Sequence, residues 1–272
     1  MELVASGISE TGPYRDLNED AIGSFAPPDP LTRQRKGHLY IVADGLGGHN
    51  AGEVASATAI EAVSQEYYSP ANHTRIEPAL RQAVQAANLR IHNLAQRNSN
   101  YRSMETTLTA VVLAGSHTYV AHIGDCRVYL WREGKLSQLT SDHSEAAELV
   151  RMRVLKPERV RDHPGRNVLT RTLGSKLIPR PDYLRHPILP GDRLALCSDG
   201  LWSEVDETEL SEVLGNGATP EEACRELVHR ALSRECLDNL SLQIINVLAV
   251  EADPEPAVPR ASWLSGIFQR GR

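Results

Sequence analysis

The acidic residues that flank apolar runs are the residues of this chain whose types and spacing most directly suggest chemistry. They are Glu19-Asp20, Asp44-Gly45, Asp199-Gly200 and Asp238-Asn239. Asp44 directly follows the apolar run 39–43, and Asp199 follows the run 194–198. Runs of this length predict buried strands, which hold a carboxylate at a fixed position at the strand end. Several such ends coming together would offer only oxygen ligands, which suit Mg²⁺ or Mn²⁺ and do not suit zinc or copper.

Hydrophobic periodicity predicts the elements that would position these carboxylates. A period near 3.6 residues predicts a helix with Pro78 near its start, and further helices are expected at about 51–67 and 220–233. Strands are expected at 108–114, 119–123, 128–131, 194–197 and 242–250. Residues 26–37 are rich in proline and polar residues, so we expect a loop there, between two early strands. Because strands and helices come in blocks, without strict alternation, the pattern predicts an α+β fold.

The composition of the 272 residues argues against several classes of function. A net charge of −6 and a pI of about 5.9 disfavour a broad nucleic-acid-binding surface. No apolar run reaches the roughly 18 residues that a transmembrane helix needs, and the first residues are not expected to form a secretory signal. The four cysteines lack C-x-x-C spacing, so we expect free thiols in a cytoplasmic protein.

The segment 251–272 differs in character from residues 1–250, which we expect to form one domain. The prolines of this segment predict a flexible tail, and its end is first apolar and then basic. A short docking or membrane-surface segment is one interpretation of that end, and a poorly ordered terminus is the one we favour.

Several short motifs follow one another along the chain. They are Arg15-x-x-Asn18-Glu19-Asp20, residues 42–49, Thr106-Thr107-Leu108, Gly124-Asp125-Cys126-Arg127, residues 140–144, residues 166–174, Ser198-Asp199-Gly200-Leu201-Trp202 and Asp238-Asn239. In this order they resemble the metal-dependent protein phosphatases (PPM, the type 2C serine/threonine phosphatases), and they look most like the compact bacterial branch. Three positions depart from the usual family pattern: Glu105 stands for glycine, Cys126 for serine and Ser241 for threonine.

This resemblance implies a four-layer αββα sandwich, in which helices flank two central, mostly antiparallel β-sheets. It implies a serine/threonine phosphoprotein phosphatase in which a metal-bridged water attacks the phosphoryl group directly, without a phosphoenzyme intermediate. Phosphate monoesters hydrolyse extremely slowly without catalysis, and two cations can activate a water and neutralise the phosphoryl oxygens. The implied partners are phosphorylated proteins, targets of a bacterial serine/threonine kinase, and the enzyme is expected to be a monomer without a membrane span.

The resemblance also implies roles for individual residues. Two tightly bound Mn²⁺ or Mg²⁺ ions are expected on the matching residues Asp20, Asp44, Asp199 and Asp238 and on the carbonyl of Gly45. Glu19 is expected to act mainly through bound water, and Asp125 matches a residue that binds a third, looser ion in bacterial members. Arg15 matches the arginine that grips the phosphate through bidentate hydrogen bonds. His49 is expected either to protonate the leaving seryl oxygen or to orient neighbouring groups in its loop.

Simpler interpretations exist for several of these residues. Asp-Gly dipeptides are favoured in turns, and Asp125 could be a turn residue that pairs with Arg127. We expect His143 and Ser144 to cap the helix that follows them. Segment 145–165 is charged and lacks apolar periodicity, so we expect it to lie at the surface, where members of the family carry a mobile flap.

Two functions from other classes compete with the phosphatase hypothesis. A non-catalytic phosphoprotein-binding module could have the same fold, because fold does not determine function, but the complete set of carboxylates argues against it. A dinucleotide-binding unit would need a glycine fingerprint after the strand. The spacing Gly45-x-Gly47-x-x-Asn50 does not fit that fingerprint, and Asp44 would repel a phosphate.

Overall fold

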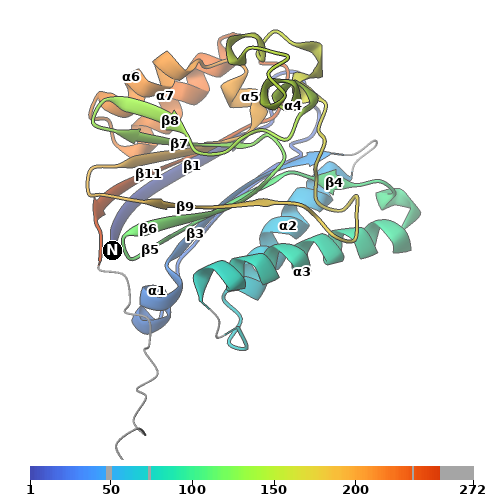
Figure 1. Ribbon diagram of the computed structural model, residues 1–272, viewed down its shortest axis with the longest axis horizontal. Coiled ribbons are helices and arrows are strands. Elements are labelled where there is room, and N and C mark those ends of the chain that lie inside the picture. The colour runs from blue at the N-terminus through green and yellow to red at the C-terminus, as the bar shows by residue number, and fades with distance from the viewer. Residues whose placement is uncertain (47–50, 73–74, 235, 252–272) are drawn as a thin grey trace, which may run out of the picture.

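Two β-sheets stacked face to face form the centre of the computed structural model, which describes residues 1–46, 51–72, 75–234 and 236–251 (Figure 1). The first sheet has the strand order β1-β11-β10-β7-β8, with the bounds Glu2–Glu10, Leu240–Ala249, Arg193–Cys197, Arg127–Arg132 and Lys135–Gln138. The second sheet has the order β2-β3-β5-β6-β9, with the bounds Asp20–Phe25, His38–Leu46, Leu108–Ala114, His117–Ile123 and Asp182–Pro187, and β4 (Glu105–Thr106) pairs with β3. Each of these strand pairs is antiparallel.

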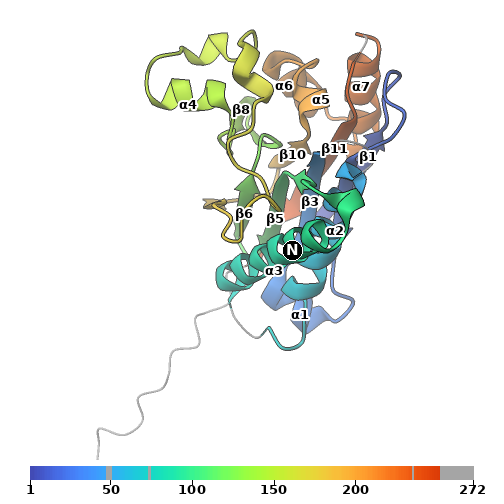
Figure 2. The same cartoon turned by 90° about the vertical axis from the view of Figure 1, so that its right-hand side faces the viewer.

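Helices cover the outer faces of both sheets. The second sheet is covered by α2 (Gly52–Tyr67) and α3 (Ile76–Arg97). The first sheet is covered by α5 (Asp199–Trp202), α6 (Glu207–Gly215) and α7 (Pro220–Leu232). A segment with α4 (Glu145–Arg151) and the 3-10 turns η2 (Pro157–Arg159) and η3 (Pro164–Asn167) projects from one end of the sandwich (Figure 2). The expected four-layer αββα sandwich is therefore confirmed.

Strand β3 shows how the sequence produces these layers. Successive side chains of a strand point to opposite faces of its sheet. Leu39, Ile41 and Ala43 pack in the core beneath α2 and α3, whereas Tyr40 and Val42 pack in the core between the two sheets. A run that is apolar at every position therefore fits a strand that is buried on both faces.

One predicted loop is wrong. The Pro-rich segment 26–37 contains a short helix, α1 (Pro30–Lys36), which begins after Asp29. The Asp29 carboxylate accepts a hydrogen bond of 2.8 Å from the Thr32 amide, and Pro30 occupies the first helical position. Both features are common helix starts, and the density of prolines concealed them.

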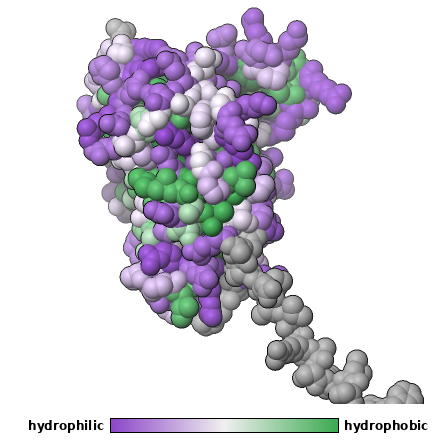
Figure 3. Space-filling model, turned by 90° about the vertical axis from the view of Figure 1, so that its left-hand side faces the viewer, coloured by the Kyte–Doolittle hydropathy of each residue, from purple (hydrophilic) through white to green (hydrophobic). Residues whose placement is uncertain are grey.

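The surface of the protein is mostly polar. The face seen from the left of Figure 1, away from α2 and α3, is mostly hydrophilic, with a central band of hydrophobic side chains and smaller hydrophobic patches (Figure 3). Among the described residues, no helix has the length and hydropathy needed to cross a membrane. All four cysteines are buried free thiols. The division at residue 250 stays a prediction, because the segment 252–272 lies outside the described residues.

Candidate functional site

One pocket of about 350 Å³ brings together most of the predicted site residues. Its lining comprises Arg15, Glu19, Asp44, Gly45, Leu46, Asp125, Asn167, Leu169, Asp199, Asp238 and Asn239. These residues come from the ends of strands in both sheets and from the loops beside them. The sandwich therefore places carboxylates that are far apart in the sequence around a single small space.

Asp20 is not among the residues that line this pocket, and its side chain connects the two sheets. It faces Asp44 across the β2–β3 pair, in direct register. The Asp20 carboxylate accepts a hydrogen bond of 2.6 Å from the Ser198 hydroxyl, and that hydroxyl accepts one of 2.9 Å from the Ser241 amide. Ser198 follows β10 and Ser241 lies on β11, so Asp20 is fixed by groups of the opposite sheet.

Hydrogen bonds and close packing fix the backbone of Asp44 and Gly45. Thr107 Oγ1 accepts a hydrogen bond of 2.8 Å from the Asp44 amide, and Thr106 Oγ1 donates one of 2.9 Å to the Asp44 carbonyl. A Cβ at Gly45 would lie 2.0 Å from the carbonyl oxygen of Gly52, so a side chain cannot fit there without moving the start of α2. The absence of a side chain at Gly45 thus allows this backbone to pack against α2 while it lines the pocket.

Asn239 is a site residue that the sequence analysis did not assign. Its Oδ1 accepts a hydrogen bond of 2.8 Å from the Glu19 amide, and its Nδ2 donates to the carbonyls of Thr11 and Leu17 at 2.8 and 2.9 Å. Asn239 therefore shapes the N-terminal loop that carries Arg15 and Glu19. The Asp-Asn dipeptide was the available signal, but only Asp238 received a role from it.

Burial and mutual repulsion dominate the electrostatics of the carboxylates. Burial raises the pKa of Asp20 to about 6, with hydrogen bonds from Ser198 and Ser241 acting in the opposite direction. Burial, together with the neighbouring Asp238 and Asp20, raises the pKa of Asp199 to about 7. Cations at this position would relieve the repulsion, and oxygen donors of this kind are the ligands that Mg²⁺ and Mn²⁺ prefer.

The same two causes act on Asp44 and Asp125. Burial and the charges of Asp20 and Asp199 hold the pKa of Asp44 well above its usual value. Burial and the charge of Asp199 do the same for the pKa of Asp125. Each carboxylate thus makes its neighbours harder to ionise, which is the behaviour of a group of anions that lacks enough positive charge.

Arg15 and Asp125 differ in how well the chain itself satisfies them. Arg15 Nη2 lies 2.8 Å from Asp238 Oδ1, and the two side chains are 45% and 36% exposed. Asp125 is only 2% exposed, and its buried Oδ1 has no hydrogen-bond partner among the described residues. The alternative in which Asp125 pairs with Arg127 is wrong, because Arg127 makes its salt bridge with Asp142.

Comparison with known proteins identifies the family. The family model described as Protein phosphatase 2C matches residues 16–240. The chain belongs to the protein phosphatase 2C family. The serine/threonine phosphatase stp of Listeria monocytogenes is 37% identical over 248 residues, which cover 90% of this chain and 94% of that protein. The resemblance inferred from the motifs is therefore confirmed.

Solved structures agree with this assignment. Serine/threonine phosphatase Stp1 from Staphylococcus aureus matches with a TM-score of 0.83 at 30% identity, over 92% of this chain and 96% of that one. The catalytic domain of the serine/threonine protein phosphatase PstP was solved in complex with two manganese ions. It matches with a TM-score of 0.78 at 31% identity, over 91% of this chain and 99% of that one.

Two predicted features of this phosphatase 2C chain are the role of His49 and the effect of Glu105. His49 lies outside the described residues, so its role stays a prediction. Among the described residues, no three His, Cys, Asp or Glu side chains are already gathered at the spacing of a metal cluster. Glu105 replaces the family glycine without needing unusual backbone, because it lies in β4 and its carboxylate accepts a 2.5 Å hydrogen bond from Thr172.

The motif that precedes α4 behaves only partly as expected. Ser144 caps α4 as expected, accepting a hydrogen bond of 3.4 Å from the Ala147 amide. The expectation that His143 also caps this helix is wrong, because its ring is turned toward Gly124 and Asp182. Within segment 145–165 most residues are exposed, as predicted.

Proposed function

We propose that this chain is a metal-dependent phosphatase that removes phosphate from phosphoserine and phosphothreonine in proteins. The observation that carries the proposal is the single pocket in which carboxylates from both sheets surround a small space beside an arginine. The names and bound ions of its relatives support the same activity.

Within this proposal, the carboxylates of Asp20, Asp44, Asp199 and Asp238 and the carbonyl of Gly45 hold two Mn²⁺ or Mg²⁺ ions. The two cations supply a water of lowered pKa and neutralise charge on the phosphoryl oxygens. With both ions bound, water would attack phosphorus directly while the bond from phosphorus to the seryl or threonyl oxygen breaks, and the chain contributes no covalent nucleophile. Glu19 acts through water: its own carboxylate is already bonded to the Gly52 amide at the start of α2.

Arg15 has a second role in this proposal, which is to hold the phosphate. A guanidinium presents two parallel donors that match two phosphate oxygens. Because its pairing with Asp238 is half exposed, Arg15 can exchange that partner for the substrate at little cost. His49 remains the proposed donor of a proton to the leaving seryl or threonyl oxygen, with a purely orienting role as its alternative.

Asp125 is the proposed ligand of a third, weakly bound ion. The buried Oδ1 without a partner and the position of Asp125 at the pocket wall support this role. One carboxylate with waters holds Mg²⁺ loosely, so this ion is expected to exchange readily.

The substrates that we propose are targets of a bacterial serine/threonine kinase, with the phosphatase acting as a monomer in the cytoplasm. The bacterial origin of the relatives supports the first point, and the four buried free thiols support a reducing compartment.

Hydrolysis assays test the proposal. The purified chain should release phosphate from para-nitrophenyl phosphate and from a phosphothreonine peptide when Mn²⁺ is present, and EDTA should abolish both activities. Okadaic-acid-type inhibitors should have little effect. Binding of the phosphopeptide without turnover at any Mn²⁺ concentration would favour the non-catalytic binding module instead.

A further inference from the structure

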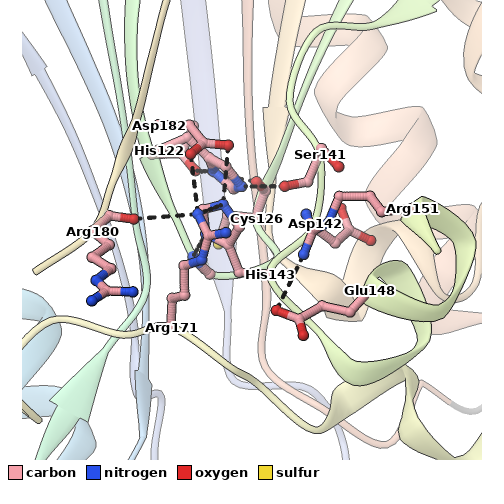
Figure 4. Close-up of polar contacts among 12 residues, drawn as sticks. His122, Cys126, Ser141, Asp142, His143, Glu148, Arg151, Arg171, Arg180 and Asp182 are labelled. Atoms are coloured by element: carbon pink, nitrogen blue, oxygen red, sulfur yellow. Dashed lines mark hydrogen bonds and ion pairs between the residues drawn. The ribbon is translucent and has the colours of Figure 1, made fainter.

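His143 contacts three other segments of the chain, and Figure 4 shows its ring next to Asp182 and Arg171. Its ring is fully buried, and Nδ1 accepts a hydrogen bond of 3.1 Å from the Gly124 amide. Its backbone amide donates to the Gly124 carbonyl at 2.7 Å, and its carbonyl accepts from the Thr170 amide at 2.8 Å. On the other side of the ring, Nε2 lies 3.2 Å from Asp182 Oδ2 and 3.1 Å from Arg171 Nη1.

The partners of His143 determine its tautomer. Because the Gly124 amide can only donate, Nδ1 must be the acceptor, and the ring proton lies on Nε2. Nε2 donates this proton to Asp182, and the nearby Arg171 Nη1 directs its own proton to the same carboxylate. Arg171 Nη1 donates to the other oxygen of Asp182 at 3.1 Å, which anchors that carboxylate at the start of β9. The two ring nitrogens thus serve two different segments, and each can be tested separately.

The turn that His143 holds leads directly into Asp125. Gly124 has a φ of +111°, and a Cβ there would lie 2.5 Å from the Thr107 side chain, so the turn has little freedom to change its sequence. The Asp125 carbonyl accepts a hydrogen bond of 3.0 Å from the Trp202 indole. Since Asp125 Oδ1 has no partner of its own, the direction of this carboxylate depends on how the backbone at 124 and 125 is held.

We propose that His143 is a positioning residue for Asp125. Its Nδ1 holds the turn at Gly124 and thereby sets the direction in which Asp125 presents its carboxylate to a cation. This inference rests on the proposed function and assigns a role in it to a residue outside the pocket lining. His143 and Thr170 flank segment 145–165, so the same hydrogen bonds tie the base of that segment to the turn.

Two substitutions separate the roles of the two ring nitrogens. The amide oxygen of asparagine can replace Nδ1 as an acceptor, whereas the amide nitrogen of glutamine can reach the place of Nε2 as a donor. His143→Asn therefore keeps an acceptor for Gly124 and loses the bond to Asp182, and His143→Gln does the reverse. Both variants remove the aromatic ring, so the loss of its packing is common to the pair.

The first readout is the metal requirement. His143→Gln should raise the Mn²⁺ concentration for half-maximal hydrolysis by about tenfold, as the loss of an outer partner of a ligand does, with little change in the KM for para-nitrophenyl phosphate. His143→Asn should stay close to the wild type. So should Asp182→Asn, which changes the Nε2 partner and weakens the salt bridge to Arg171 but leaves the bond from Gly124 to Nδ1 in place. Asp125→Ala should show the same defect as His143→Gln in a stronger form.

The second readout needs no activity. In the metal-free protein, hydrogen exchange at the Gly124 amide should be about tenfold faster in His143→Gln than in His143→Asn, because only the former lacks its acceptor. If His143→Gln does not fold, His143→Leu carries the same expectation, since leucine fills much of the ring volume and accepts no hydrogen bond.

Equal metal requirements or equal exchange rates in the two variants would overturn the positioning role, because a residue that only fills space affects both alike. Failure of the proposed function looks different. In that case the wild type itself shows no Mn²⁺-dependent hydrolysis, while exchange at Gly124 still distinguishes the variants.

Discussion

Two buried carboxylates close to each other in the fold, Asp142 and Asp125, are treated in opposite ways by the chain. Arg127 donates to Asp142 from Nε at 3.1 Å and from Nη2 at 2.7 Å, and Gln138 adds a third donor at 3.2 Å. The guanidinium also lies 3.8 Å from the centre of the Trp202 ring. Asp125 has none of this support for its Oδ1, although it is as deeply buried.

The contrast distinguishes a buried carboxylate that stabilises the fold from buried carboxylates that are expected to bind a cation. A buried charge is tolerated when the chain supplies its counter-charge and hydrogen bonds, as it does for Asp142. The site carboxylates instead raise one another's pKa values, and only Asp238 has a salt bridge among them in the described residues. We therefore expect loss of Asp142 to harm the fold and loss of a site carboxylate to harm catalysis alone.

Removing Asp142 should have the largest effect. Asp142→Ala leaves Arg127 buried without its counter-charge, so the free energy of unfolding should fall by about 3–5 kcal/mol in urea titrations. The double variant Arg127→Met with Asp142→Leu should lose clearly less, because it removes both charges together. If the single and double variants were equally unstable, the loss of stability would come from lost packing and not from an unpaired buried charge.

Removing Asp199 should lower catalytic activity without lowering the stability of the metal-free protein. Asp199→Ala should lower kcat by roughly 10²–10³-fold, as expected for the loss of a major electrostatic element of a site. The metal-free variant should be at least as stable as the metal-free wild type, since one of the repelling carboxylates is gone. Asp44→Ala is the matched variant at the tip of β3. A large loss of stability in both would place these residues with Asp142 as structural.

The fold could be predicted from the sequence where local pattern and burial agree. The apolar run of β3 required burial on two faces, and a sheet between a helix layer and a second sheet satisfies that requirement. The short helix α1 could not be found this way, because its start depends on a single cap at Asp29 within a proline-rich segment.

The site could be predicted in its carboxylates, in Arg15 and in Gly45, which line the pocket, but not in the groups that support them. Strand-end acids have a local signature, and the motif order added the family. The residues that hold these acids in place have no local signature. The Ser198 hydroxyl donates to Asp20 from the opposite sheet, and Asn239 accepts from the Glu19 amide, which is far away in the sequence. Contacts of this kind depend on how the sheets stack, so they become visible only in the folded structure. The same holds for His143, whose position before α4 suggested a cap.

The stability of the metal-free protein should depend on pH because the site carboxylates have raised pKa values. In the metal-free protein, the pKa of Asp20 is raised to about 6 and that of Asp199 to about 7, so the folded state binds more protons than the unfolded state between about pH 4 and 7. The stability gained from these raised pKa values is therefore lost as pH rises through this range. Buried histidines act oppositely: burial lowers the pKa of His122 to about 4 and also lowers the pKa values of His38 and His143. Burial raises the pKa values of Asp44 and Asp125 as well, so we expect the carboxylates to dominate.

We therefore expect the Tm of the EDTA-treated protein to fall between pH 5 and 7.5 in calorimetry. Added Mn²⁺ should raise the Tm most strongly at the higher pH, where the ligands are ionised. At a Mn²⁺ concentration of 100 times the Kd, the free energy of unfolding should rise by about 2.7 kcal/mol. In Asp199→Ala both the pH slope and the Mn²⁺ effect should shrink. If the Tm at pH 7.5 did not change on addition of Mn²⁺, the assignment of these carboxylates to a metal site would be wrong.

Arg15→Ala should give the smallest effect, because Arg15 is the exposed partner in this charged region. The KM for a phosphopeptide should rise roughly tenfold with little change in kcat, since a charged hydrogen bond to phosphate is present in both the ground and transition states. The Mn²⁺ requirement should stay level or fall, because Asp238 is freed from its salt bridge and a competing positive charge is removed. Arg15→Lys keeps the charge but not the paired donors, so it should recover only part of the KM. If kcat fell while the KM stayed constant, Arg15 would act on the transition state alone, and its proposed task of holding the bound phosphate would be wrong.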